Sequence, residues 1–162
     1  LWDPRQYLPA MTQPMVWISG TNDFAYPMNS WRKSHRLSKG DRTLCLRVAM
    51  PHGHLPGWAP AEIHTFANAL FAKEPPLIRL LESVSDGTGL RVRFQAHPEA
   101  PAVKAELCFT QDKGPWQTRK WQIVPAQLGS GEAHAKPPTG ATAWYMNLTD
   151  RRALVVSSEH CE

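Results

Sequence analysis

The sequence predicts a mixed fold, with a parallel α/β segment first and a small all-β unit after it. In the first 74 residues, short apolar runs alternate with a helix-forming stretch, an order typical of a parallel sheet. Further on, apolar and polar residues alternate with a period of two between turn residues, as in half-buried antiparallel strands. Pro75 and Pro76 lie where the pattern changes. We therefore predict two domains, residues 1–74 and residues 75–162.

The first predicted strand is the apolar run Met15–Ile18. A run this short and this continuous favours a strand buried on both faces of a parallel sheet. A second strand is predicted over residues 43–50. The stretch between the two has helical character, with Met28, Trp31 and His35 on one side. Strand, helix and strand in this order predict a right-handed crossover and a parallel pair.

Three chemically reactive side chains follow these strands: Asp23, His52 and His54. Because the carboxyl ends of parallel strands lie at the same edge of a sheet, we expect the carboxylate to reach an imidazole. An acid that orients a histidine and stabilises its imidazolium belongs to the nucleophile–base–acid arrangement of acyl transfer. The sequence therefore predicts Asp23 as the acid and His52 or His54 as the base. No G-x-S-x-G motif, which would mark the nucleophile, occurs in the chain.

Each of these residues has a second interpretation. Asp23 follows Asn22 and is suited to capping the next helix without any catalytic role. His52 and His54 have the H-x-H spacing of metal ligands, although only His64 and Cys45 are nearby candidates for the further ligands that a metal site needs. The choice between the two histidines as base stays open. The other histidine would then support the base or contact the substrate.

Residues 58–73 predict an amphipathic helix. Pro60 suits its first turn, and Ile63, Phe66, Ala67 and Leu70 recur at helical spacing. We expect this apolar face to pack on the sheet.

The second unit is most regular over residues 90–97 and 103–110, where apolar residues alternate with polar ones. A hairpin turn is predicted at residues 112–114. Further strands are predicted at residues 78–84, 116–124, 141–148 and 153–158. Short strands in this number favour an immunoglobulin-like β-sandwich.

Three tryptophans of this unit have two interpretations. Trp116, Trp121 and Trp144 form either a platform for stacking on sugars or part of the core of a small sandwich. The core interpretation is favoured, because aromatic residues dominate the packing of small cores.

Two stretches of the chain resemble a known family: DPRQYLPAMTQPMVWISGTNDFAYP at residues 3–27 and MPHGHLPGWAPAEIHTFANAL at residues 50–70. They resemble the C-terminal third of an α/β-hydrolase, nearest to the dienelactone-hydrolase and acetylxylan-esterase-like branch related to prolyl oligopeptidase. The resemblance covers roughly the first 74 residues and includes strand, acid, helix, strand, histidine and closing helix in order. It implies a C-terminal fragment of an α/β-hydrolase parallel sheet with an appended immunoglobulin-like β-sandwich.

The resemblance also implies a function. Asp23 would be the triad acid and His52 or His54 the base of a serine hydrolase, a carboxylesterase or acetyl (xylan) esterase, whose nucleophile lies upstream of Leu1. We expect a small-molecule ester or acetylated carbohydrate as substrate, no cofactor, and a chain that is inactive alone. We also expect the missing N-terminal segment or a second copy to cover the open sheet edge, and a secreted or periplasmic location. The alternative is a non-catalytic binding or interaction module with a remnant hydrolase segment.

Composition excludes several other classes. With 42% hydrophobic and 20% charged residues, the chain is typical of a globular protein. The net charge of +4 comes from scattered basic residues, so nucleic-acid binding is not expected. No apolar run approaches the roughly 20 residues that span a bilayer, so no membrane partner is expected. Cys45, Cys108 and Cys161 are spaced too widely and irregularly for a zinc motif or a disulfide scaffold.

Overall fold

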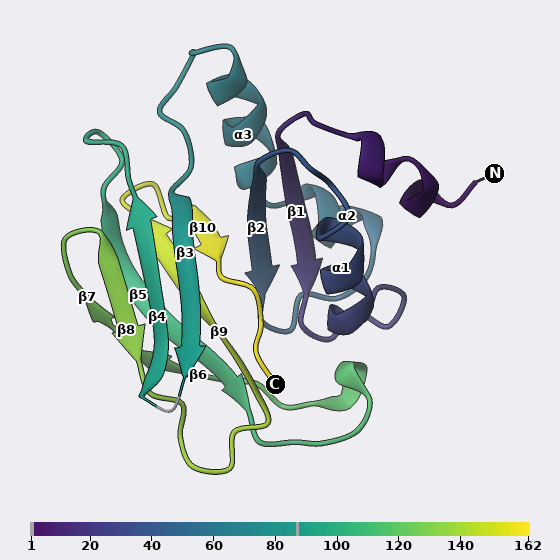
Figure 1. Ribbon diagram of the computed structural model, residues 1–162, viewed down its shortest axis with the longest axis vertical. Helices are drawn as coiled ribbons and strands as arrows, with labels where there is room; N and C mark the ends of the chain where they lie inside the picture. Colours follow the sequence, from purple (N-terminus) through teal and green to yellow (C-terminus); the bar gives the residue numbers. More distant parts are fainter. Residues whose placement is uncertain (1, 87) are drawn as a thin grey trace.

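A computed structural model describes residues 2–86 and 88–162 (Figure 1). The N-terminal part contains the 3-10 helices η1 (Pro4–Gln6) and η2 (Leu8–Ala10), then β1 (Met15–Gly20), α1 (Met28–His35), β2 (Arg42–Arg47), α2 (His54–Trp58) and α3 (Glu62–Leu70). The remainder contains β3 (Arg79–Asp86), β4 (Gly89–Gln95), β5 (Ala102–Thr110), the 3-10 helix η3 (Trp116–Thr118), β6 (Gln122–Pro125), β7 (Gln127–Leu128), β8 (Glu132–Ala135), β9 (Ala143–Asp150) and β10 (Val155–Ser157).

Most strands belong to two antiparallel sheets. Their strand orders are β3-β4-β8-β7 and β10-β9-β5-β6, and the sheets pack face to face. One buried cluster joins them, with Leu90 and Val92 from β4, Leu107 from β5, and Met146 and Leu148 from β9. The period-two alternation predicted these inward-facing positions correctly. Figure 1 shows β1 and β2 with α1 and α2 on one side of the molecule and the two antiparallel sheets on the other.

The predicted fold class is wrong. The chain is mostly β with few helices, and its small parallel sheet holds only β1 and β2, which is not a fragment of the α/β-hydrolase sheet. β1 is half-buried over residues 15–18, whereas the apolar run predicted burial on both faces. The reason is that an apolar run indicates that a strand is shielded, but not how many strands share its sheet. The immunoglobulin-like character of the β-sandwich is unconfirmed.

The sheet β10-β9-β5-β6 is covered on both faces. Its second face carries Cys108 of β5 and Tyr145 of β9, neither of which is exposed. These side chains share a second core cluster with Met28 and Trp31 of α1 and Leu46 of β2. The alternation over residues 103–110 predicted a solvent-exposed face for position 108, because it contains only one apolar stripe. This second cluster crosses the boundary predicted after residue 74, and the division into domains stays a prediction.

Polar contacts also tie the N-terminal part to the sandwich. Glu62 at the start of α3 is fully buried, and its carboxylate lies 2.6 Å from the Arg47 guanidinium of β2. The same carboxylate accepts the backbone N–H of Val155 in β10 at 2.7 Å. On β2, the backbone N–H of Leu46 donates to the Ser157 hydroxyl at 2.7 Å. The small parallel sheet therefore rests on β10 instead of on further parallel strands.

The helix predicted over residues 58–73 is shorter in the structure, where α2 ends at Trp58 and α3 spans Glu62–Leu70, and its predicted core face is only partly covered. Glu62 and Thr65 are the buried residues of α3, while Ile63 and Phe66 are half-buried. Leu70 is 55% exposed. The helix therefore turns its Glu62 side inwards instead of its apolar side. The Glu62–Arg47 ion pair explains this orientation, because a buried carboxylate must face its partner.

The three tryptophans pack into the two cores. Trp116 is buried in η3, stacks on Trp121 at 6.4 Å between ring centroids, and lies under the Arg119 guanidinium. Trp144 packs against the sandwich core, and its indole N–H donates to the Ser85 hydroxyl at 3.2 Å. The strand predicted over residues 116–124 is reduced to β6, because η3 occupies its first residues.

Neither membrane helices nor cross-links contribute to the described part of the chain. None of its helices combines the length and the apolar character needed to cross a membrane. Cys45, Cys108 and Cys161 are free thiols.

Candidate active site

The loops that follow β1 and β2 bring Asp23 and His52 together, as the order of the strands predicted. Both residues line a cavity of about 470 Å³, together with Trp17, Tyr26 and Trp31. Cavities of this size are typical of small-molecule sites. Asp23 is 7% exposed and the His52 side chain 36% exposed, so the pair connects the interior to an accessible surface.

Three hydrogen bonds hold the Asp23 carboxylate. Its Oδ1 atom accepts from the backbone N–H groups of Ala25 at 2.8 Å and Tyr26 at 2.9 Å. Its Oδ2 atom lies 3.1 Å from Nδ1 of His52. The backbone bonds close the turn before α1, whose N-cap is Pro27, so Asp23 does not itself cap that helix. One carboxylate oxygen thus orders the loop, and the other faces the imidazole.

The electrostatics of the pair determine which ring nitrogen carries the proton. Burial by itself raises the pKa of Asp23. The hydrogen bonds from the Tyr26 N–H, His52 and the Ala25 N–H lower it by more than burial raises it, so the pKa lies below its usual value. Asp23 is therefore ionised near neutral pH. An ionised carboxylate only accepts hydrogen bonds, so Nδ1 of His52 must donate. The Nε2 atom of neutral His52 is then left with a free lone pair.

The structure separates the two histidines of the H-x-H pair. His52 lines the cavity, and its ring also contacts the rings of Phe24 at 4.9 Å and Tyr26 at 5.7 Å between centroids. His54 is the first residue of α2, and its ring faces Trp58 at 5.5 Å. Of the two candidates, only His52 is brought to Asp23.

The H-x-H pair also lacks the surroundings of a metal site. Among residues 2–86 and 88–162, no group of three or more His, Cys, Asp or Glu side chains is arranged to hold a metal ion. His64 is exposed on α3, while Cys45 is buried in β2. Burial raises the pKa of the Cys45 thiol to about 12, so it is not a thiolate near neutral pH.

A close backbone approach positions the His52 loop beside the end of β1. A Cβ atom on Gly20 would lie 2.1 Å from the carbonyl oxygen of Met50, so a side chain at residue 20 would force the two loops apart. The next residue, Thr21, accepts the backbone N–H of Ala49 through its hydroxyl at 3.0 Å. Ala49 has a φ of 55°, a left-handed turn that directs the chain from β2 towards His52.

Asn22 ties the same loop to the sandwich. Its side-chain amide donates to the carbonyl of Arg119 at 2.7 Å and lies 3.3 Å from that of Gln117, in and just after η3. The Asn22 carbonyl in turn accepts from the Thr21 hydroxyl at 2.6 Å. The position of Asp23 therefore depends on residues almost a hundred positions further along the chain.

No nucleophile is positioned beside His52 within the described residues. Ser19, Ser30 and Ser34 line the cavity. The Ser34 hydroxyl donates to the backbone carbonyl of Ser30 at 3.0 Å. In the part of the chain that the structure describes, no serine hydroxyl is hydrogen-bonded to His52. What the site offers is an oriented acid–base pair beside a mainly apolar cavity.

Comparisons with known proteins identify no family. No family model matches the chain, and no curated protein matches it. Among solved structures, a carbohydrate acetylesterase from Xanthomonas citri matches with a TM-score of 0.45 and 15% sequence identity. The match covers 93% of this chain and 41% of that one, so the chain spans about two-fifths of the length of that structure. That protein is an esterase by its description, and a similarity this low says nothing about the activity of this chain.

Sequence reasoning missed the residues that support the pair. Gly20 stands at the end of the predicted strand, where a glycine signals close backbone approach, and this signal was available in the sequence. Asn22 carries no such signal, because its partners lie in η3 and no local pattern connects them. Phe24 and Tyr26 flank His52 although their rings are largely exposed.

Proposed function

We propose that Asp23 and His52 are the acid and the general base of an ester-hydrolysing site. The observation that carries this proposal is the 3.1 Å contact between Asp23 Oδ2 and His52 Nδ1, with Asp23 Oδ1 anchored by two backbone N–H groups. A carboxylate held in this way orients the imidazole and stabilises its charged form. The adjoining cavity of about 470 Å³ has room for one side of a small ester.

The chemistry requires a hydroxyl nucleophile within reach of His52 Nε2. The nitrogen takes the hydroxyl proton as the oxygen attacks the ester carbonyl, and Asp23 stabilises the imidazolium that forms. The imidazolium then returns the proton to the leaving alcohol, which departs and leaves an acyl group on the nucleophile. Water, deprotonated by the same nitrogen, attacks the acyl group, and the released hydroxyl regains a proton.

In the finer form of the proposal, the nucleophile is a serine in a segment upstream of these residues, because no G-x-S-x-G motif occurs in the sequence. The substrate is a small carboxylic ester or an acetylated carbohydrate. The partner that supplies the serine is the upstream segment or another copy of a longer chain. The chain alone is then inactive, since the acid and base have no oxygen to activate.

A binding module is the competing function. One observation favours it: within the described residues, the acid–base pair has no serine hydroxyl bonded to it and borders a mainly apolar cavity. In that case Asp23 and His52 only order the two loops. Their replacement would then change stability without changing any turnover.

The deciding experiment is Asp23→Asn in the longer protein that carries the upstream serine. An amide oxygen at Oδ2 still accepts from Nδ1, but an amide nitrogen there would present the wrong tautomer to the serine, and the imidazolium would lose its counter-charge. We expect turnover of an acetyl ester to fall by about 10⁴-fold with the fold intact. Glu99→Gln, an exposed carboxylate outside the cavity, is the matched control and should keep full turnover. Equal turnover in both variants would favour the binding module.

A further inference from the structure

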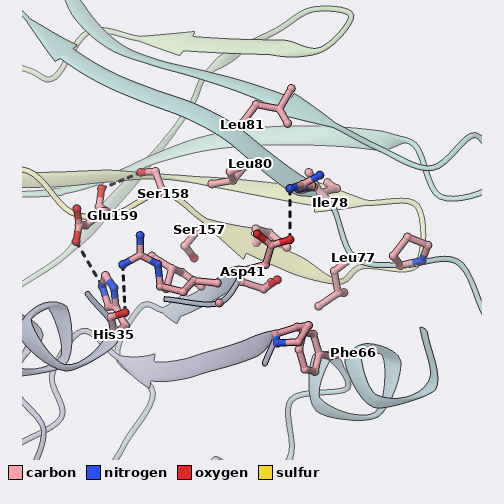
Figure 2. A pocket seen from close by; sticks show the side chains of 18 of the residues that line it. His35, Asp41, Phe66, Leu77, Ile78, Leu80, Leu81, Ser157, Ser158 and Glu159 are labelled. Carbon is pink, nitrogen blue, oxygen red and sulfur yellow. Dashed lines mark hydrogen bonds and ion pairs between the residues drawn. The ribbon is translucent and has the colours of Figure 1, made fainter. Parts of the chain in front are cut away.

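A second cavity, of about 750 Å³, lies between the N-terminal part and the sandwich. Phe66 of α3 and the apolar side chains Leu77, Ile78 and Leu80 line it (Figure 2), and Phe66 packs against the cluster that holds Leu77 and Ile78. None of its lining residues belongs to the cavity of Asp23 and His52. It is therefore a separate candidate site, whatever the chemistry of the first one.

One wall of this cavity is apolar and reaches the surface. Leu77 and Ile78 are buried, whereas Leu70 is 55% and Leu81 51% exposed. Phe66 lies half-buried between the interior and the surface. Apolar side chains that continue from the interior to solvent are stabilised when an apolar ligand covers them.

Most polar side chains of the cavity are bound by the protein itself, although neither ring nitrogen of His35 has a hydrogen-bond partner in the described structure. The Ser157 hydroxyl donates to Asn147 at 2.6 Å, and the Ser158 hydroxyl donates to the Glu159 carbonyl at 3.0 Å. The Glu159 carboxylate pairs with Arg36, and Asp41 lies 3.3 Å from Arg79. A ligand rich in hydroxyl groups would find few free partners here.

Two cations of the lining remain uncompensated. Lys39 and Arg42 both line the cavity, and within the described residues neither makes an ion pair. In the part of the chain that the structure describes, the Arg42 guanidinium donates only to the backbone carbonyl of His35, at 3.1 Å. The third acid of the lining, Glu82, is bound to Arg93 at 3.2 Å. The lining of this cavity, which is apolar on one wall, thus carries surplus positive charge.

We propose that this cavity binds an anionic amphiphile, namely a carboxylate on an alkyl chain. The alkyl chain covers Leu70, Leu77 and Leu81, and the carboxylate lies near Lys39 and Arg42. Apolar contact supplies most of the affinity, while the cations select the charged head group.

The 162-residue chain can be titrated with octanoate by calorimetry, with chemical shifts of the backbone amides as a second readout. We expect saturable binding with shifts around Leu77–Leu81. Octan-1-ol should bind about tenfold more weakly, and acetate not at all, because one lacks the charge and the other the chain. Lys39→Gln should weaken octanoate binding about threefold, and Lys39→Gln with Arg42→Gln about tenfold. Lys33→Gln, on an exposed α1 lysine outside the cavity, is the matched control.

Two further variants keep the test independent of folding defects. Asp41→Asn frees Arg79 and should tighten octanoate binding about threefold, an outcome that a damaged protein would not give. Leu81→Asp, at an exposed position, should abolish binding. The proposal is overturned if octanoate and octan-1-ol bind equally, if the charge variants bind like the unchanged chain, or if the shifts map to the Asp23–His52 cavity.

Discussion

Acidification from pH 7.5 to pH 5.0 should destabilise the protein through two buried histidines. His35 of α1 and His160 near the C-terminus are each 2% exposed. Their rings pack against Trp31 at 4.7 Å and Trp116 at 5.3 Å between centroids. None of their four ring nitrogens has a hydrogen-bond partner in the described structure. Both histidines are therefore buried in the neutral form.

The surrounding charges do not stabilise the protonated forms of these two histidines enough to offset their burial. Burial lowers the pKa of His35 to about 4. The Glu159 carboxylate, 3.5 Å from Nε2 without hydrogen-bond geometry, opposes this lowering, whereas the positive charges of Arg42 and Arg36 add to it. Burial lowers the pKa of His160 to about 3, and Arg32 lowers it further, although Glu162 also lies 3.5 Å from its Nε2 atom. Desolvation thus outweighs the distant carboxylates at both sites.

The magnitude follows from linkage between protonation and folding. Below pH 6.5 the unfolded chain binds a proton at each position while the native protein does not, so stability falls as the pH falls. Relative to pH 7.5, each histidine costs about 2 kcal/mol at pH 5.0, and the two together about 4 kcal/mol. The loss from His35 levels off below about pH 4. Since domains of this kind are stable by about 5–15 kcal/mol, the effect is large.

Urea unfolding followed by tryptophan fluorescence at several pH values measures this loss. The His35→Phe variant should lose about 2 kcal/mol between pH 7.5 and pH 5.0, half of the loss in the unchanged protein. The His64→Gln variant, at an exposed position of α3, should keep the full loss. The Asp23 carboxyl has a pKa below its usual value and titrates below this window. Identical pH dependence in His35→Phe and in the unchanged protein would show that burial of the neutral His35 does not cause the loss.

Three further outcomes are expected. Gly20→Ala should cost about 1–3 kcal/mol in urea unfolding, because its Cβ would meet the Met50 carbonyl, whereas Gly57→Ala, with open space around it, should not. Glu62→Ala should cost about 3 kcal/mol, the low end for a broken buried pair because Arg47 is about one-third exposed; Glu62→Gln, which can still accept from Val155, should cost less. The purified 162-residue chain should show only background hydrolysis of an activated acetyl ester. Turnover by this chain that Asp23→Asn leaves unchanged would disprove the assigned roles.

Local patterns in the sequence were enough to predict several features of the fold and of the site. Alternation with period two identified β4 and β5 and the inward positions of Leu90 and Leu107, because side chains of a strand point to opposite faces. Helical spacing identified Met28, Trp31 and His35 as the buried face of α1. Strand order predicted that Asp23 would meet a histidine, since both loops leave the same edge of a parallel pair.

The choice of the histidine that meets Asp23, and the surroundings of the pair, depend on contacts that no local pattern predicts. His52 and His54 are two residues apart, and the start of α2 turns His54 towards Trp58. The second face of the sheet holding Cys108 is buried because α1 and β2 cover it. The small parallel sheet ends at β2 because Ser157 of β10 binds its backbone. The burial of Cys108 and the end of the parallel sheet rest on contacts between residues far apart in the sequence, and such contacts leave no periodic trace in it.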